Sequence, residues 1–255
     1  MSRGIVVIKI GGSVLTGRTG FHRAADFLAD RLASEPSHRI VAVVSAELGE
    51  TDGLLAAARD WVDAPDPSTL DLLWSTGELR SAAILALALQ ARGVNAAGVN
   101  IHQAGLVTDG GGGFPGRARL RPLRLRALLA SHDIVIAPGF LARECGDAVA
   151  SLGRGGSDLT AVVLATGLGA LRCELVKDVP GYFTSDPNLD PGAQPIPALD
   201  YNSALSMADE GCELVQRQAL LAAREHGLAL TVRAIGGGNG TLISTDTTSF
   251  ASAVA

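Results

Sequence analysis

Short runs of β-branched residues alternate with long Ala- and Leu-rich stretches along this chain. Residues 5–10 and 40–44 have the composition of buried strands, and residues 21–33 between them place apolar side chains at helical spacing. Parallel strands need such a helical crossover between them. The pattern therefore predicts β-α-β units and an α/β fold whose mostly parallel sheet is covered by helices on both faces.

The same criteria extend this order through most of the chain. They predict helices at residues 79–92, 123–130, 160–166 and, as one or two helices, 201–225, and strands at 94–99, 133–138, 173–177 and 229–234. The four consecutive glycines in residues 109–113 predict a mobile turn between strands, with a loop that folds over a ligand as the alternative. Pro-rich residues 186–197 predict a loop. No linker or internal repeat divides the chain, so we expect one domain over residues 1–255.

Composition and charge exclude several classes of partner. The 255 residues are 47% hydrophobic and 18% charged, with a formal net charge of -5. Because nucleic acids and anionic membranes require clustered basic residues, neither is an expected partner. The strand-like apolar runs are too short to span a membrane and no signal peptide precedes them, so a cytoplasmic location is expected. Cys145, Cys173 and Cys212 lack C-x-x-C spacing, which predicts free thiols.

Two glycine clusters are candidates for anion binding. In Lys9-Ile-Gly-Gly-Ser13 a lysine ends a buried strand directly before two glycines, which favours phosphate binding, although a plain turn with a surface lysine is the alternative. In Gly153-Arg-Gly-Gly-Ser-Asp158 glycines open a helix beside an arginine whose planar group matches a carboxylate or phosphate. Helix capping by Ser157 or Asp158 is the alternative there.

Two further segments carry charged residues at loop-proximal positions. Lys177 ends a predicted strand before a loop with Pro-Gly and Asp-Pro turns, where α/β sheets bind ligands. Lys9 and Lys177 are the only lysines in the chain, which is more than surface solvation explains, although chance remains an alternative. In Ser75-Thr-Gly-Glu78 the glutamate is expected in the first turn of a helix, either favoured by the helix dipole or receiving an ammonium group.

In order along the chain, these segments resemble the catalytic domain of the aspartokinase family, within the amino acid kinase superfamily. The family signatures K-F-G-G-T-S, V-V-S-A-M, S-x-G-E, R-G-G-S-D and T-D-V-x-G-[VI]-Y-T-x-D-P correspond here to Lys9-Ile-Gly-Gly-Ser13, Val43-Val-Ser-Ala-Glu47, Ser75-Thr-Gly-Glu78, Arg154-Gly-Gly-Ser-Asp158 and Lys177-Asp-Val-Pro-Gly-Tyr-Phe-Thr-Ser-Asp-Pro187. The closing G-T-L-I is present at residues 240–243. The resemblance covers nearly the whole chain.

The resemblance implies a three-layer sandwich, the amino acid kinase fold, with the amino acid bound in about residues 1–150 and ATP in about 151–245. The implied activity is ATP-dependent phosphorylation of the side-chain carboxylate of aspartate or a close analogue. Mg²⁺ would be held mainly by the nucleotide phosphates and not by protein side chains. A homodimer is expected because members of the superfamily commonly dimerise.

The resemblance also implies roles for individual residues. Lys9 would neutralise charge on the transferring phosphoryl group, Gly11 and Gly12 would donate N–H groups to it, and Asp158 would organise the centre. On the acceptor side, Glu78 would pair with the amino group and Arg154 would bind a carboxylate. The full implied set adds Ser45, Thr51 and Ser157 on the acceptor side and Lys177, Asp178, Gly181, Phe183 and Asp186 in the nucleotide loop.

Several departures from the family pattern leave alternatives open. The family segment G-A-K-V-L-H-P is Gly211-Cys-Glu-Leu-Val-Gln-Arg217 here, so Glu213 stands where a cation is expected beside the phosphates. At ε ~20 a close like-charge pair costs several kcal/mol. The candidates for compensation are Lys177, where the family usually has threonine, and Arg217.

The alternatives to the aspartate kinase are a non-catalytic ligand-binding or partner subunit and a kinase for another small acid. The chain ends soon after residue 243, which predicts a stand-alone form without regulatory ACT domains or feedback inhibition.

Overall fold

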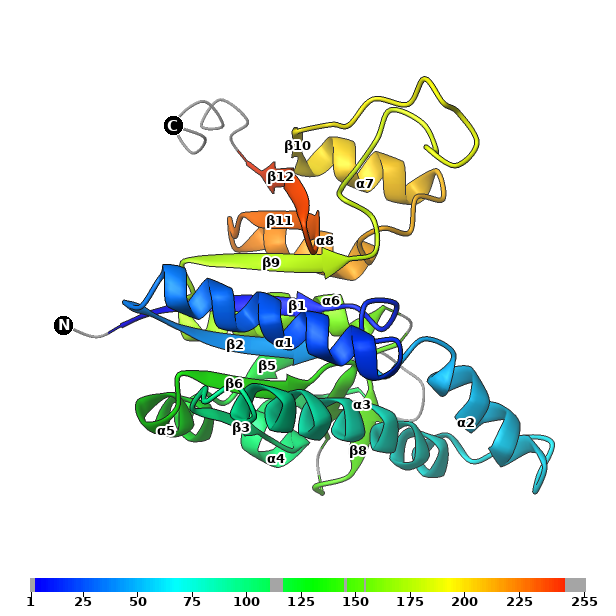
Figure 1. The fold of residues 1–255 in the computed structure, drawn as a ribbon. Coiled ribbons are helices and arrows are strands. Elements are labelled where there is room, and N and C mark those ends of the chain that lie inside the picture. Colours follow the sequence, from blue (N-terminus) through cyan, green and yellow to red (C-terminus); the bar gives the residue numbers. More distant parts are fainter. Residues whose placement is uncertain (1–2, 111–116, 145, 154, 246–255) are drawn as a thin grey trace.

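An eight-stranded sheet forms the middle of the protein (Figure 1). The computed structural model describes residues 3–110, 117–144, 146–153 and 155–245. Across the sheet the strands are β10 (Ala198–Asp200), β12 (Gly237–Ser244), β11 (Leu230–Ala234), β9 (Arg172–Lys177), β1 (Gly4–Ile10), β2 (His38–Val44), β6 (Ile134–Pro138) and β3 (Ala96–Gly98). Only β11 and β12 pair antiparallel. The prediction of a mostly parallel sheet is confirmed.

Helices cover both faces of this sheet, as Figure 1 shows. On one face lie α1 (Gly17–Ser34) and α3 (Pro67–Gln90), and on the other lie α5 (Leu123–Ser131), α6 (Gly156–Leu168), α7 (Tyr201–Asp209) and α8 (Arg217–Glu225). Alternate residues of β1 divide between the two layers: Val6, Ile8 and Ile10 pack with α1 and α3, and Val7 packs with the α6 side. The predicted three-layer architecture is confirmed.

A second, four-stranded sheet was not predicted. Its order is β5 (Ala118–Leu120), β4 (Leu106–Thr108), β7 (Leu141–Arg143) and β8 (Val149–Ser151). Strands of three residues are too short to show an alternating pattern. β8 is the last strand before α6, and strands β5, β4 and β7 contact that helix. The predicted glycine turn at 109–113 lies mostly outside the described residues, as does Cys145, whereas Cys173 and Cys212 are free thiols.

Helix boundaries differ from the prediction at α3. The helix begins at Pro67, with the Asp66 side chain accepting from the Thr69 N–H, and not near residue 79. Glu78 therefore lies in the middle of α3, where the helix dipole no longer explains it. The predicted 201–225 stretch is two helices, α7 and α8, separated by a turn. Two small helices, α2 (Glu50–Arg59) and α4 (Ile101–Ala104), complete the fold.

Within the described residues α3 is the one helix that has the length and apolar composition of a membrane span. Its buried side chains, among them Ala82, Leu85 and Leu89, pack with α1 and with β1, β2 and β6. A core helix of an α/β protein needs the same apolar surface, so the contacts of α3 account for its composition.

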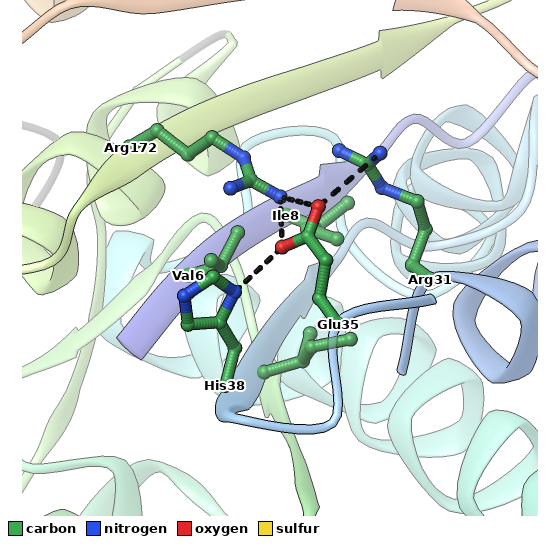
Figure 2. Close-up of a pocket in the computed structure, with 7 residues that line it drawn as sticks. Val6, Ile8, Arg31, Glu35, His38 and Arg172 are labelled. Atoms are coloured by element: carbon green, nitrogen blue, oxygen red, sulfur yellow. Dashed lines mark hydrogen bonds and ion pairs between the residues drawn. The ribbon is translucent and has the colours of Figure 1, made fainter. Parts of the chain in front are cut away.

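A buried charge cluster joins α1 to the sheet at the end opposite the strand carboxyl ends. Glu174 of β9 is 2% exposed and accepts hydrogen bonds from Arg31 and, at 2.8 Å, from Arg172 Nε, with Arg233 Nη1 at 3.7 Å. Beside it, Arg31, Arg172 and His38 converge on Glu35 (Figure 2). The carboxylates hold three guanidinium groups in place at the sheet surface.

We predict that Glu174→Ala lowers the free energy of unfolding by about 2–3 kcal/mol, because it leaves three partly buried guanidinium groups without their shared buried carboxylate. The matched control is Glu225→Ala, which removes an exposed carboxylate 3.4 Å from the exposed Arg117 and should cost less than about 1 kcal/mol. Urea denaturation of both variants measures the difference. Equal losses would show that the Glu174 cluster contributes little.

Candidate active site

Lys9 is a buried lysine near the carboxyl end of β1. Its position in the strand gives it the same facing as Val7, toward α6, and the residue is 6% exposed. The Nζ atom lies 3.0 Å from Oδ1 of Asp158. A plain turn with a surface lysine, the alternative considered from the sequence, is therefore excluded.

Asp158 is the centre of a cluster that includes both lysines of the chain. It is 2% exposed and lies in the first turn of α6. Lys177, the last residue of β9, places Nζ 2.8 Å from Oδ2 and 3.1 Å from Oδ1 of the same carboxylate. The backbone N–H of Gln216 also donates to Oδ2, at 3.3 Å. The N-cap of α6 is Gly155 with no side-chain cap, so capping does not explain Asp158.

Burial and charge shift the protonation equilibria of this cluster in a defined way. Burial lowers the pKa of Lys9 to about 8, because attraction to Asp158 offsets only part of the desolvation and Lys177 repels. Burial by itself would raise the pKa of Asp158, but attraction to Lys9 and Lys177 places it below its usual range. With all three groups charged, the cluster carries a formal charge of about +1.

The two glycines after β1 pack closely against neighbouring backbone. A Cβ on Gly12 would lie 2.4 Å from the carbonyl oxygen of Ala46, so no other residue fits without movement. The N–H of Gly11 donates to the Val176 carbonyl at 2.9 Å. Because that hydrogen is already bonded, Gly11 does not offer its N–H to a phosphate in this structure, contrary to its implied role. The role predicted for Gly12 stays a prediction.

On the α3 side of this turn, Glu78 is buried with one oxygen unpaired. The residue is 3% exposed, and its Oε1 accepts from the N–H of Ala46 at 3.2 Å. Oε2 has no hydrogen-bond partner among the described residues. Burial, with a smaller contribution from the charge of Glu50, raises the pKa of Glu78 to about 7. Such a carboxylate gains from a cationic partner that enters beside it.

Other residues predicted on the acceptor side lie just after β2 or in the first turns of helices α2 and α6. Ser45 follows β2 and donates its N–H to the Ile10 carbonyl at 3.4 Å, and Thr51 lies in the first turn of α2. Ser157 is buried against Gly139, where a Cβ would lie 2.7 Å from its Oγ. Arg154 lies outside the described residues. The structure thus connects Ser45, Gly12 and Glu78 through the Ala46 backbone.

The comparison with known families agrees with this arrangement. The model of the amino acid kinase family matches residues 4–234. The chain belongs to the amino acid kinase family. Aspartokinase from Thermus thermophilus is 37% identical over 229 residues, which are 90% of this chain and 56% of that protein. Aspartokinase 2 from Bacillus subtilis is 33% identical over 234 residues, with the same coverage of 90% and 56%. The chain spans about half the length of these curated relatives.

Solved structures place this family member beside aspartate kinases. The aspartate kinase from Synechocystis superposes with a TM-score of 0.82 at 30% identity, over 95% of this chain and 40% of that chain. Aspartokinase III from E. coli, in complex with aspartate and ADP, gives a TM-score of 0.78 at 27% identity, over 95% of this chain and 65% of that chain. The uridylate kinase from Archaeoglobus fulgidus, at 17% identity and a TM-score of 0.67, shares the fold.

The loop after β9, which the family resemblance assigns to the nucleotide, is shaped by contacts of its own. Gly181 has φ +147, and a Cβ there would lie 2.5 Å from Oγ1 of Thr241, which requires glycine. Phe183 forms an isolated bridge with Pro195. Asp178 and Asp186 are exposed, and Asp186 accepts from the N–H of Asn188 at 2.9 Å. These four positions form one loop beyond Lys177, and their contact with nucleotide stays a prediction.

The segment before α8 contributes to the site through a residue that the sequence did not single out. Glu213, expected beside the phosphates of this kinase family member, is exposed in a turn, and it is the Gln216 backbone that reaches Asp158. Arg217 pairs with Asp209 at 2.6 Å and is half exposed. Of the two proposed compensating cations, only Lys177 contacts Asp158. A backbone N–H leaves no side-chain signature, which is why Gln216 was missed.

The lysine cluster is directly testable because the chain has only two lysines. In protein labelled with ¹³C at lysine Cε, we predict that one of the two side-chain signals titrates near pH 8, from the lowered pKa of Lys9. Asp158→Asn removes the attraction that opposes burial and should lower this pKa further. NMR titration of both proteins measures the shift. An ordinary lysine pKa near 10.5 for both signals would contradict the buried cluster.

Proposed function

We propose that this protein is an ATP-dependent kinase that transfers the γ-phosphoryl group of ATP to the side-chain carboxylate of aspartate. The observation that carries the proposal is the contact of Lys9 and Lys177 with one buried carboxylate, Asp158, at the carboxyl ends of adjacent parallel strands. The similarity to aspartokinases, one of them solved with aspartate and ADP, supports this choice of acceptor and donor.

The cluster suits a reaction between two anions. Each lysine ammonium has three N–H donors, of which Lys9 uses one and Lys177 two on Asp158. In the described part of the chain the remaining donors contact no other carboxylate, which leaves them available to phosphate oxygens, and the surplus positive charge offsets the repulsion between phosphates and carboxylate. In this proposal Asp158 holds both lysines at fixed positions, and Lys177 supplies the positive charge that the family carries at the position of Glu213.

The acceptor is held on the Glu78 side. There the unpaired Oε2 of Glu78 receives the α-ammonium group, and Ser45, Thr51, Ser157 and Arg154 are proposed contacts for the remaining polar groups. An aspartate carboxylate is ionised at neutral pH, so no general base is required. A bond forms between a carboxylate oxygen and the γ-phosphorus, the bond from that phosphorus to the β–γ bridging oxygen breaks, and ADP leaves.

Mg²⁺ fits this site as a companion of the nucleotide. Among the described residues no group of three or more His, Cys, Asp or Glu side chains is arranged to hold a metal ion, and Asp158 is already bonded to both lysines. We therefore propose that the phosphates hold the ion, which adds positive charge to them when bound. The proposed nucleotide loop contains Asp178, Gly181, Phe183 and Asp186. A homodimer and a cytoplasmic location stay predictions.

We predict aspartate-dependent release of ADP from ATP by the wild-type protein. Lys9→Ala and Lys177→Met should each lower kcat by about 10²–10³-fold, the usual effect of removing one group that stabilises transition-state charge. Arg217→Ala, which removes a half-exposed cation paired with Asp209, is the control and should stay within about threefold of wild type. A coupled ADP assay across amino acids measures all four proteins. No turnover with any carboxylate acceptor, or full activity of Lys9→Ala, would refute the proposal.

The pH dependence follows from Glu78. With a pKa of about 7, the carboxyl is charged above pH 7 and protonated below it, so its attraction for the acceptor ammonium is lost as the pH falls. We predict that KM for aspartate rises by about tenfold per pH unit below 7 and is flat above it. Glu78→Gln should raise KM and remove this dependence. If KM of the wild type for aspartate stays constant between pH 5.5 and 8, Glu78 is not the ammonium site.

A further inference from the structure

One face of α3 contacts two segments next to the proposed acceptor site, the end of β8 and the start of α2. Asp71, Trp74 and Glu78 are spaced i, i+3 and i+7, so their side chains share this face. Asp71 is 2% exposed, and its Oδ2 accepts from the N–H of Ser151 at 3.0 Å, a contact between residues 80 apart in sequence. Ser151 ends β8, immediately before the loop that leads to Ser157 and Asp158.

Trp74 makes the second connection, one turn further along the helix. Its indole N–H donates to the carbonyl of Thr51 at 3.1 Å, and its ring meets Phe140 edge-on, with centroids 5.9 Å apart. The carbonyl of Phe140 accepts from the N–H of Leu152 at 2.7 Å. Phe140 has φ 66, a left-handed conformation that an aromatic residue adopts only when its surroundings hold it.

We propose that Asp71 and Trp74 are positioning residues for the amino acid acceptor. They fix the end of β8 at Ser151 and the start of α2 at Thr51 relative to Glu78, which is carried by the same helix. This inference rests on the proposed function, because it takes Glu78, Thr51 and Ser157 as acceptor contacts. Asp158 is held separately by its ion pairs with Lys9 and Lys177. Loss of the Asp71 contact should therefore weaken binding of the acceptor more than binding of the nucleotide.

The kinetic test separates the two substrates. Asp71→Leu keeps the approximate size of the side chain but leaves the Ser151 N–H without its acceptor, whereas Asp71→Asn retains an oxygen at that position. We expect Asp71→Leu to raise KM for aspartate by about tenfold with KM for ATP unchanged, and Asp71→Asn to restore it to within about twofold of wild type. Trp74→Phe, which keeps a ring but loses the N–H, should raise KM for aspartate by about threefold.

Hydrogen–deuterium exchange supplies a readout that does not need turnover. Peptides that cover residues 150–158 should exchange faster in Asp71→Leu than in wild type and at the wild-type rate in Asp71→Asn. An unchanged KM for aspartate in Asp71→Leu, equal increases in both KM values, or unchanged exchange would each overturn the inference. A wild-type protein without aspartate turnover refutes the proposed function instead, and the exchange experiment still decides whether Asp71 holds the segment.

Discussion

The proposed active site depends on one buried carboxylate that holds two ammonium groups. Asp158 lies within about 3 Å of Lys9 and Lys177, and all three are largely removed from water. Burial of these charges is unfavourable in itself and is tolerated because each ion has a partner at hydrogen-bond distance. The result is a fixed excess of positive charge, in a place where water screens it little. Such a site can bring two negatively charged reactants together.

The sheet produces this arrangement through strand order and register. β1 lies between β2 and β9, and Lys9 is paired in register with Leu175. Lys177 is two residues after Leu175, so its side chain lies on the same face of the sheet as that of Lys9. The start of α6 packs over that face and supplies Asp158. A lysine in place of the family's usual threonine at position 177 thus reaches the same carboxylate as Lys9. This contact offers a physical reason why the chain tolerates Glu213, which the structure leaves exposed.

Much of the fold could be predicted from the sequence because its strands and helices are long and strongly patterned. The mostly parallel sheet and the helical layers follow from such segments, whereas the grouping of Lys9 with Asp158 was implied by the resemblance to aspartokinases. The second sheet and the true start of α3 could not be predicted in this way. Three-residue strands are too short to show the alternation of apolar and polar residues, and the first residues of α3 are mostly polar. Contacts made by backbone groups, such as the Gln216 N–H on Asp158 and the Gly11 N–H on Val176, have no side-chain signature. Asp71 was missed because it precedes the predicted helix start near residue 79 and because aspartate side chains are usually exposed.

A crystal structure of the protein with Mg-ADP and aspartate would show whether the two lysines contact the phosphates. We predict that Nζ of Lys9 and Nζ of Lys177 both lie within hydrogen-bond distance of terminal phosphate oxygens, with Asp158 still between them and the aspartate ammonium at Glu78. A nucleotide bound with its phosphates away from both lysines, or an aspartate bound on another face of the protein, would contradict this prediction.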